Sequence, residues 1–295
     1  MSILSGKHIL LGVTGSIAAY KAADLASKLT QAGAKVDVIL TNAAEKFVTP
    51  LTYQSVTGRK TYTDQDLWGD EAHVLHVSLG KTADLLVIAP CTADTMAKLA
   101  HGIADNLLTV TALAATCPIL IAPAMDGGMF DHPATQANLQ TLQTRSVLVA
   151  GPAAGHLASG MSGVGRMLEP ADILGHIRIA LGKSGKLAGK KVIVTAGGTQ
   201  EAIDPVRVIT NHSSGKQGYA LAQAALDAGA KVTLITTPTA LTPPVGADIV
   251  HVKSVQDMLD ALLQESADAL IMAAAGADFR PVDVAKEKKK KRDGI

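Results

Sequence analysis

Three short segments bring glycine, hydroxyl and acidic side chains together where an apolar strand is predicted to end. In the first, GVTGSIAAYK (residues 12–21), Gly12 and Gly15 permit a tight turn, and Ser16 stands at the expected N-cap of a helix. Backbone N–H groups exposed at such a turn can bind a phosphate group. The spacing differs from GxGxxG, so a dinucleotide fingerprint is not indicated, and a purely structural glycine turn explains the segment just as well.

The second and third segments also lie between a predicted strand and a predicted helix. In APCTADT (89–95), the side chains that would allow close approach by a flat ligand are Cys91, Thr92, Ala93 and Thr95. A cysteine such as Cys91 is more often a small packed residue than a nucleophile. The third segment, 121–136, carries Met125 and Asp126. Open α/β proteins bind ligands at the carboxyl ends of parallel strands, so the three segments are predicted to form one ligand site.

Two further features of the first half could contribute chemistry. His76, in HVLHVSLG (73–80), is the best-placed titratable group, although a lone histidine is more often structural. A glycine-rich segment that contains Arg166 is typical of a flap over a site or of an ordinary loop; it reads LASGMSGVGRMLEP (157–170). The sequence has no metal-ligand spacing and no GxSxG elbow, so metal and serine-hydrolase sites are not indicated.

In the second half, polar residues concentrate in TAGGTQEAIDPVRVITNHSSGKQG (195–218), directly before a predicted helix. The residues suited to an anionic, phosphate-bearing ligand are Asp204, Arg207, Asn211, Ser213, Ser214 and Lys216. ADFRP (277–281) follows a predicted buried strand and directs Asp278 to the same edge. Lysines 288–291 could reach phosphate groups or be solvated.

The elements that must position these segments alternate between strand and helix. Continuous Val/Ile/Leu runs predict strands at 8–13, 35–40, 84–90, 118–123 and 146–150, and then at 191–197, 231–237, 248–252 and 268–276. Helical spacing predicts helices between the first two strands and at 214–229 and 254–264. We therefore expect an α/β protein with two doubly wound, Rossmann-like parallel-sheet domains. The predicted boundaries are domain 1–182, linker 183–189 and domain 190–295, the second being short of the usual five or six strands.

Composition narrows the class of protein. The 295 residues carry 27 Lys and Arg against 26 Asp and Glu, a net charge of +1, so no global field favours nucleic acid. No apolar run approaches the ~20 residues of a membrane helix, and no signal peptide is evident. Two cysteines form no disulfide framework. These features predict a soluble cytoplasmic protein without nucleic-acid or membrane partners.

The ordered motifs, from about residue 5 to 291, resemble a family of bifunctional bacterial flavoproteins. They are GSIAAYK, PCTADT, PAMDGGM, GVGRM, DPVRVITNHSSGKQG and ADFRP. The family's halves are phosphopantothenoylcysteine decarboxylase and phosphopantothenate–cysteine ligase of coenzyme A biosynthesis. The resemblance implies a first domain of the homo-oligomeric flavin-containing cysteine decarboxylase type, assembled as a homotrimer or dodecamer with flavin sites between subunits. The residues it implies for FMN binding are Gly15, Ser16, Thr41, Pro90, Cys91, Thr92, Asp94, Thr95 and Met125.

The resemblance also implies a reaction: FMN oxidises the cysteine thiol of 4′-phosphopantothenoylcysteine, carbon dioxide leaves, and reduction gives 4′-phosphopantetheine. His76 matches the active-site base, a role that suits a group titrating near neutral pH. The residues implied for substrate binding include Asp126, Met129 and Arg166. Ser159 stands where the family has a proton-donating cysteine, and a hydroxyl is a far weaker acid. Asp126 and Asp94 stand where the family usually has asparagine.

For the second half, the resemblance implies that CTP, with Mg²⁺, activates phosphopantothenate as an acyl-cytidylate, which cysteine then attacks. Asn211 matches the residue supporting the second step, and Arg207, Asp278 and Lys288 match contacts to CTP or the intermediate. Family ligase domains continue for about a hundred further residues, so ligase activity is predicted to suffer from truncation. Two alternative functions are a peptidyl-cysteine oxidative decarboxylase, which also lacks the flap cysteine, and a non-catalytic flavoprotein regulator.

Overall fold

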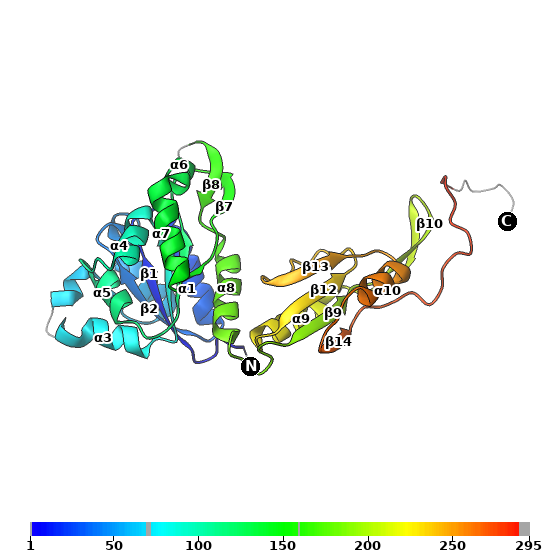
Figure 1. The fold of residues 1–295 in the computed structure, drawn as a ribbon, viewed down its shortest axis with the longest axis horizontal. Helices are drawn as coiled ribbons and strands as arrows, with labels where there is room; N and C mark the ends of the chain where they lie inside the picture. Colours follow the sequence, from blue (N-terminus) through cyan, green and yellow to red (C-terminus); the bar gives the residue numbers. More distant parts are fainter. Residues whose placement is uncertain (1, 69–71, 159, 289–295) are drawn as a thin grey trace. The chain divides into compact units, whose positions relative to one another are not determined.

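A computed structural model of the protein describes residues 2–68, 72–158 and 160–288 (Figure 1). The chain divides into two compact units, Met1–Leu181 and Gly182–Ile295, and each is described by itself. In the part of the chain that is described, no helix has the length and apolar character needed to cross a bilayer.

The first unit is built on a six-stranded parallel sheet. Its strands are β1 (His8–Val13), β2 (Lys35–Leu40), β3 (Thr61–Tyr62), β4 (Leu85–Cys91), β5 (Ile119–Pro123) and β6 (Leu148–Val149). Their order is β3-β2-β1-β4-β5-β6, and each neighbouring pair is parallel. The order reverses between β1 and β4, which places the topological switch point of a doubly wound sheet there. The predicted fold class is confirmed.

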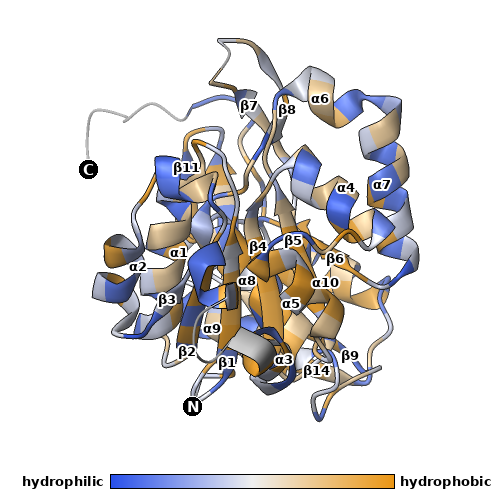
Figure 2. Ribbon diagram, turned by 90° about the vertical axis from the view of Figure 1, so that its left-hand side faces the viewer, coloured by the Kyte–Doolittle hydropathy of each residue, from blue (hydrophilic) through white to orange (hydrophobic). Residues whose placement is uncertain are grey.

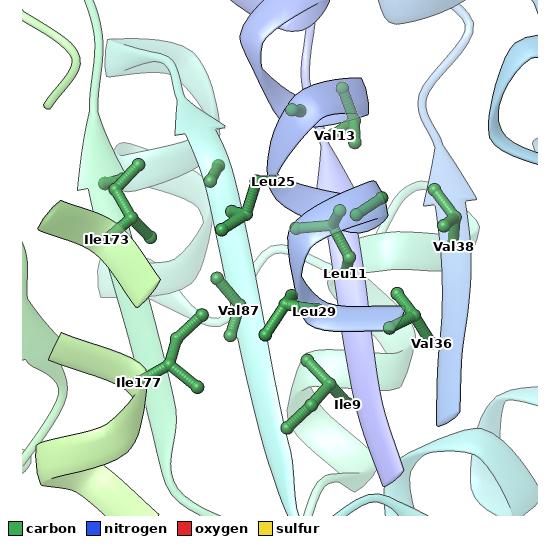
Figure 3. Close-up of a cluster of buried hydrophobic side chains, with 14 of the residues drawn as sticks. Ile9, Leu11, Val13, Leu25, Leu29, Val36, Val38, Val87, Ile173 and Ile177 are labelled. Carbon is green, nitrogen blue, oxygen red and sulfur yellow. The ribbon is translucent and has the colours of Figure 1, made fainter. Parts of the chain in front are cut away.

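Helices cover both faces of this sheet, which is why its central strands are mainly apolar. Figure 2 shows predominantly hydrophobic residues along β4 and β5. One face packs against α1 (Ala19–Gln31), α2 (Pro50–Thr57) and α8 (Pro170–Gly182), and the other against α3 (Ala72–Thr82), α4 (Ala93–His101), α5 (Leu107–Ala114) and α7 (Pro133–Thr144). Alternate residues of β1 enter different cores: Ile9 and Leu11 pack with Leu25 of α1 (Figure 3), whereas Leu10 packs on the opposite face.

Shorter elements complete the first unit. They are the 3₁₀ turns η1 (Ala44–Lys46) and η2 (Asp64–Trp68), helix α6 (Gly127–Asp131), and an antiparallel hairpin of β7 (Ala153–His156) and β8 (Ser162–Arg166). The segment 157–170, predicted as a flap or loop, therefore includes the second strand of a hairpin. The segment 121–136 is less open than predicted, because α6 and the start of α7 lie within it.

The second unit contains a four-stranded parallel sheet in the order β13-β12-β9-β14. The strands are β9 (Lys191–Ala196), β12 (Lys231–Thr236), β13 (Ala247–His251) and β14 (Ala269–Met272), at the predicted places. Helices α9 (Lys216–Asp227) and α10 (Val255–Leu263) pack against separate apolar clusters. The segment 200–210 forms a hairpin of β10 (Gln200–Asp204) and β11 (Arg207–Thr210), which the sequence did not predict.

Candidate functional site

A cavity of about 580 Å³ opens at the carboxyl edge of the first sheet, beside the switch point. The loops after β1, β2, β4 and β5 form its walls, so the prediction that the three segments share one edge is confirmed. Eight of its lining residues were singled out from the sequence: Gly15, Ser16, Thr41, Thr92, Ala93, Asp94, Thr95 and Met125. Met129, predicted to bind substrate, also lines this cavity. Its volume lies within the range typical of cofactor sites.

The turn after β1 is held close to the loop after β2. A Cβ atom built on Gly15 would lie 2.4 Å from the Cβ of Ala43, so only glycine fits there. The prediction that Ser16 is the helix N-cap is wrong: α1 begins at Ala19 with Ala18 as its N-cap. The Ser16 hydroxyl instead accepts a hydrogen bond from the Ala18 N–H at 3.2 Å. The chain makes an extra turn before the helix starts, and this turn forms part of the cavity wall.

The turn after β4 is tied to the first turn by Thr14. The Thr14 hydroxyl donates to the Pro90 carbonyl at 2.8 Å and accepts from the Thr92 N–H at 3.1 Å. Thr92 is the N-cap of α4 and accepts from the Thr95 N–H. The side chain of Cys91, by contrast, is fully buried in the core, and burial raises the pKa of its thiol to about 12. Neither Pro90 nor Cys91 is among the residues found to line the cavity.

Asp94 lies at the mouth of the cavity with Lys98, one helical turn along α4. The Lys98 ammonium is 3.2 Å from the Asp94 carboxylate and 3.0 Å from that of Asp105. The hydrogen bonds that Lys98 donates to these two carboxylates raise the pKa of Lys98, and the one to Asp105 has the larger effect. Sequence reasoning missed Lys98, although its position four residues after Asp94 on a helix could have indicated the pair.

A second cavity, of about 570 Å³, adjoins the first and shares Ser16, Ala124 and Met125 with it. Its walls come from α1, the loop after β5 and the β7–β8 hairpin, and they include Asp126 and Arg166, both predicted to bind substrate. The Met125 N–H donates to the Gly165 carbonyl at 3.0 Å, which joins the hairpin to the loop. Asp126 caps α6 by accepting from the Gly128 N–H at 3.0 Å.

One buried cation of the second cavity was missed by sequence reasoning. The Lys21 side chain is only 9% exposed, and its ammonium lies 2.8 Å from the Glu169 carboxylate. That carboxylate also accepts from the Arg166 guanidinium at 2.5 Å. The hydrogen bond from Lys21, above all, lowers the pKa of Glu169, which therefore stays ionised near neutral pH. Lys21 lies inside the motif GSIAAYK. A cation among otherwise apolar residues of a predicted helix could have pointed to it from the sequence alone.

His76 lies apart from both cavities. It is in α3, and it is not among the residues that line either cavity within the described chain. Its Nδ1 atom is buried and has no hydrogen-bond partner in the described residues. Such an unsatisfied atom is costly in a purely structural histidine. Ser159, the predicted proton donor, lies outside the described residues.

The polar segment of the second unit gathers at the carboxyl edge of its sheet. The Asn211 amide donates to the Gly276 carbonyl at 2.8 Å, which joins the segment after β11 to the segment after β14. A Cβ built on Gly198 would lie 2.6 Å from the Asn211 carbonyl oxygen, so glycine is required at this crossing. Arg207 forms an ion pair with the buried Asp204. Asp278 and Lys288 are exposed.

Known proteins match the chain over both units. Residues 2–182 match the family Flavoprotein, and residues 187–295 match the DNA/pantothenate metabolism flavoprotein C-terminal domain. The coenzyme A biosynthesis bifunctional protein CoaBC of Vibrio cholerae serotype O1 is 49% identical over 296 residues, covering 99% of this chain and 74% of the relative. That of Bacillus subtilis is 46% identical over 297 residues, with 99% and 73% covered.

Two solved structures are similar to the first unit. A PPC decarboxylase mutant complexed with pantothenoylaminoethenethiol is 37% identical with a TM-score of 0.55, covering 59% of this chain and 97% of that one. The FMN binding protein AtHal3 is 35% identical with a TM-score of 0.53, covering 59% and 95%. The resemblance drawn from the ordered motifs is confirmed, and the chain belongs to the family of bifunctional CoaBC proteins of coenzyme A biosynthesis.

Proposed function

We propose that the protein acts in coenzyme A biosynthesis and decarboxylates 4′-phosphopantothenoylcysteine to 4′-phosphopantetheine with FMN. The observation that carries this proposal is the pair of adjoining cavities at the switch point of the first unit. The first has hydroxyl groups and glycine in its wall together with Asp94 and Lys98, and the second has a mainly apolar wall that also contains Asp126 and Arg166. Two adjoining cavities suit a cofactor and a substrate that must meet.

The first cavity fits FMN by its hydrogen-bonding groups and by its volume. We propose that Ser16, Thr41, Thr92 and Thr95 hold the flavin nucleotide through hydroxyl and backbone groups, and that the turn at Gly15 lets the ligand approach the backbone. Asp94 and Met125, which line the cavity, complete the proposed contacts, and Pro90 and Cys91 would support the site by packing behind the turn. The chemistry that bound FMN supplies is the reversible two-electron oxidation of the substrate's cysteine side chain.

The second cavity suits the substrate. We propose that Asp126 and Arg166 contact it from the wall of the second cavity, and that Met129 contacts it from the wall of the first. An ionised Asp126 would repel the carboxylate that leaves as carbon dioxide, whereas a neutral residue would bind it. Ser159 is the proposed donor of the proton that completes reduction.

We propose His76 as the base that takes the substrate's thiol proton, and a homotrimer or dodecamer as the active assembly. The position of His76 supports both proposals together, because among the described residues it lines neither cavity of its own chain. A second copy that presents its cavity to His76 would bring base and substrate together.

We propose that the chain consists of a domain at 1–182, a linker at 183–189 and a second domain at 190–295. We propose that the second domain is a phosphopantothenate–cysteine ligase half that uses CTP and Mg²⁺. Asn211 would orient the activated carboxyl group, and Arg207, Asp278 and Lys288 would contact CTP or the intermediate. The family match over residues 187–295 supports this role, and the chain spans 74% of the length of the Vibrio cholerae relative. A cytoplasmic location is proposed from the two free cysteines.

The test is the absorbance spectrum of the purified protein together with the mass of the product formed from 4′-phosphopantothenoylcysteine. A flavin spectrum and 4′-phosphopantetheine are the expected results. A flavin spectrum with a product that stops at the unsaturated enethiol would contradict the proposed role of Ser159 and favour the peptidyl-cysteine decarboxylase alternative. A flavin-binding protein that leaves the substrate unchanged would favour a regulator, and a colourless, inert protein would overturn the proposal.

A further inference from the structure

His8 joins three elements near the edge of the first sheet that lies opposite the two cavities. It is the first residue of β1, and its side chain is 17% exposed. Its Nε2 atom lies 2.7 Å from the carboxylate of Asp37 in β2, and its Nδ1 atom lies 3.0 Å from the carbonyl oxygen of Thr82, the last residue of α3. An ionised carboxylate and a carbonyl group can only accept hydrogen bonds, so each ring nitrogen must donate one. Only the doubly protonated imidazolium form of His8 does so.

The positive charge of His8 is stabilised from two sides. The Asp37 carboxylate is buried, and the Arg59 guanidinium also donates to it, at 2.7 and 2.9 Å, which keeps it ionised. The hydrogen bond to Asp37, above all, raises the pKa of His8 above its ordinary value of 6.5, although burial opposes this effect. At the other ring nitrogen, the cation lies at the carboxyl end of α3, where the helix dipole favours positive charge. His8 is therefore charged near neutral pH.

The remaining charged groups around His8 keep their charge near neutral pH. The Asp84 carboxylate accepts from the His8 N–H at 2.8 Å and forms an ion pair with Lys7. Beyond Asp37 lie the Tyr62 phenol and the Lys60 ammonium, which is 4.8 Å from the centre of the Tyr62 ring. None of these side-chain types ordinarily titrates between about pH 6 and 9. A change of charge in this network over that range therefore belongs to His8.

Loss of one proton leaves His8 with a single N–H group. We expect that group to stay on Asp37, because a hydrogen bond to a charged acceptor is stronger than one to a carbonyl group. The lone pair of Nδ1 then faces the Thr82 carbonyl oxygen, and two acceptors repel each other. The end of α3 loses both a hydrogen bond and a favourable cation. Asp37 itself stays paired with Arg59, so the change is confined to the contact with α3.

We propose that His8 is a positioning residue: in its doubly protonated form it clamps the end of α3 to the sheet, and on deprotonation it releases that end. Less than two helical turns before Thr82, the same helix carries His76. The clamp therefore bears on where the His76 side chain is held. Its consequence for decarboxylation rests on the proposed function, in which His76 is the base, whereas the clamp itself does not.

The first measurement is amide hydrogen exchange of the full chain as purified, followed by peptide mass and corrected for the intrinsic exchange rate, which itself rises with pH. Between about pH 6 and 9, protection of the last turn of α3 should fall about 10-fold, as expected for loss of one hydrogen bond to a charged group. Protection of α1, on the same sheet, should not change. His8→Gln, which is neutral at every pH, should show the low protection throughout. The matched control is His101→Gln, which alters an exposed histidine of α4 and should behave as wild type.

The second measurement is kcat for carbon dioxide release from 4′-phosphopantothenoylcysteine. The ratio of wild type to His8→Gln should be several-fold at about pH 6 and should approach one at about pH 9, where both proteins carry a neutral side chain. A merely structural role would lower kcat equally at both values, and that result would overturn the proposal. A wild-type protein whose α3 protection stays constant with pH would also overturn it, and this series decides the matter even if His8→Gln does not fold. Failure of the proposed function is separate: wild type would then release no carbon dioxide at any pH, while hydrogen exchange would still report on the clamp.

Discussion

Replacing Gly15 with alanine tests the close approach of the two turns that wall the first cavity. The added Cβ would lie 2.4 Å from the Cβ of Ala43 and 3.1 Å from its carbonyl carbon, against 3.4–4 Å for ordinary contact. Ala43 or the Gly15 turn must therefore move by about 1 Å. Overpacking of this kind costs about 1–3 kcal/mol.

That cost must appear in one of two measurements. If the turns stay in place, the free energy of unfolding, measured with urea, falls by about 1–3 kcal/mol. If they move apart, restoring the binding geometry costs the same energy, and the Kd for FMN, measured by flavin fluorescence, rises about 5- to 150-fold. Gly128→Ala is the control, because its Cβ would lie no closer than 3.6 Å to its nearest neighbour. A Gly15→Ala protein that matches wild type in both measurements would refute the steric reasoning.

Three further predictions follow from other residues of the first unit. His76→Asn should lower the rate of carbon dioxide release about 10²- to 10⁴-fold while the flavin spectrum is retained; loss of flavin would contradict its placement outside the cavities. Burial raises the pKa of Asp37, but hydrogen bonds from His8 and Arg59 outweigh this effect and lower the pKa to about 2. These hydrogen bonds therefore stabilise the folded protein fully above the unfolded-state pKa of about 3.9, and this stabilisation is lost as the pH falls through 2. Asp37→Asn should therefore remove about 2 kcal/mol of this acid-dependent stability. The measurement is the free energy of unfolding in urea as a function of pH. If its slope between about pH 5 and 2 is the same in the variant and the wild type, the hydrogen bonds of Asp37 contribute nothing to stability. Cys91, whose buried thiol has a pKa raised to about 12, should resist iodoacetamide at pH 8 until denaturant is added, as followed by peptide mass; labelling in the native protein would contradict its burial.

Local sequence signals predicted most strands correctly and helix ends less well. The central strands of both sheets, such as β1, β4, β9 and β12, are mainly apolar runs because helices cover both faces, and this signal needs no knowledge of the tertiary contacts. The helix start at Ser16 was wrong because a hydroxyl before an apolar run resembles an N-cap, whereas the chain makes one more turn before α1. The β10–β11 hairpin was missed because its exposed residues, such as Val208 and Ile209, show no buried face.

What the sequence by itself determined was the doubly wound fold, the edge at which the turns after β1, β4 and β5 meet, and the family. Parallel strands place every strand-end turn on one side of a sheet, so chain order alone brings these turns together. Only the tertiary structure decided which side chains face the cavities. It placed Cys91 in the core, kept His76 away from both cavities, and paired Lys21 with Glu169, which lies 148 residues further along the chain. Such pairings depend on how helices pack on the sheet, and local patterns carry no record of contacts between residues so distant in the chain.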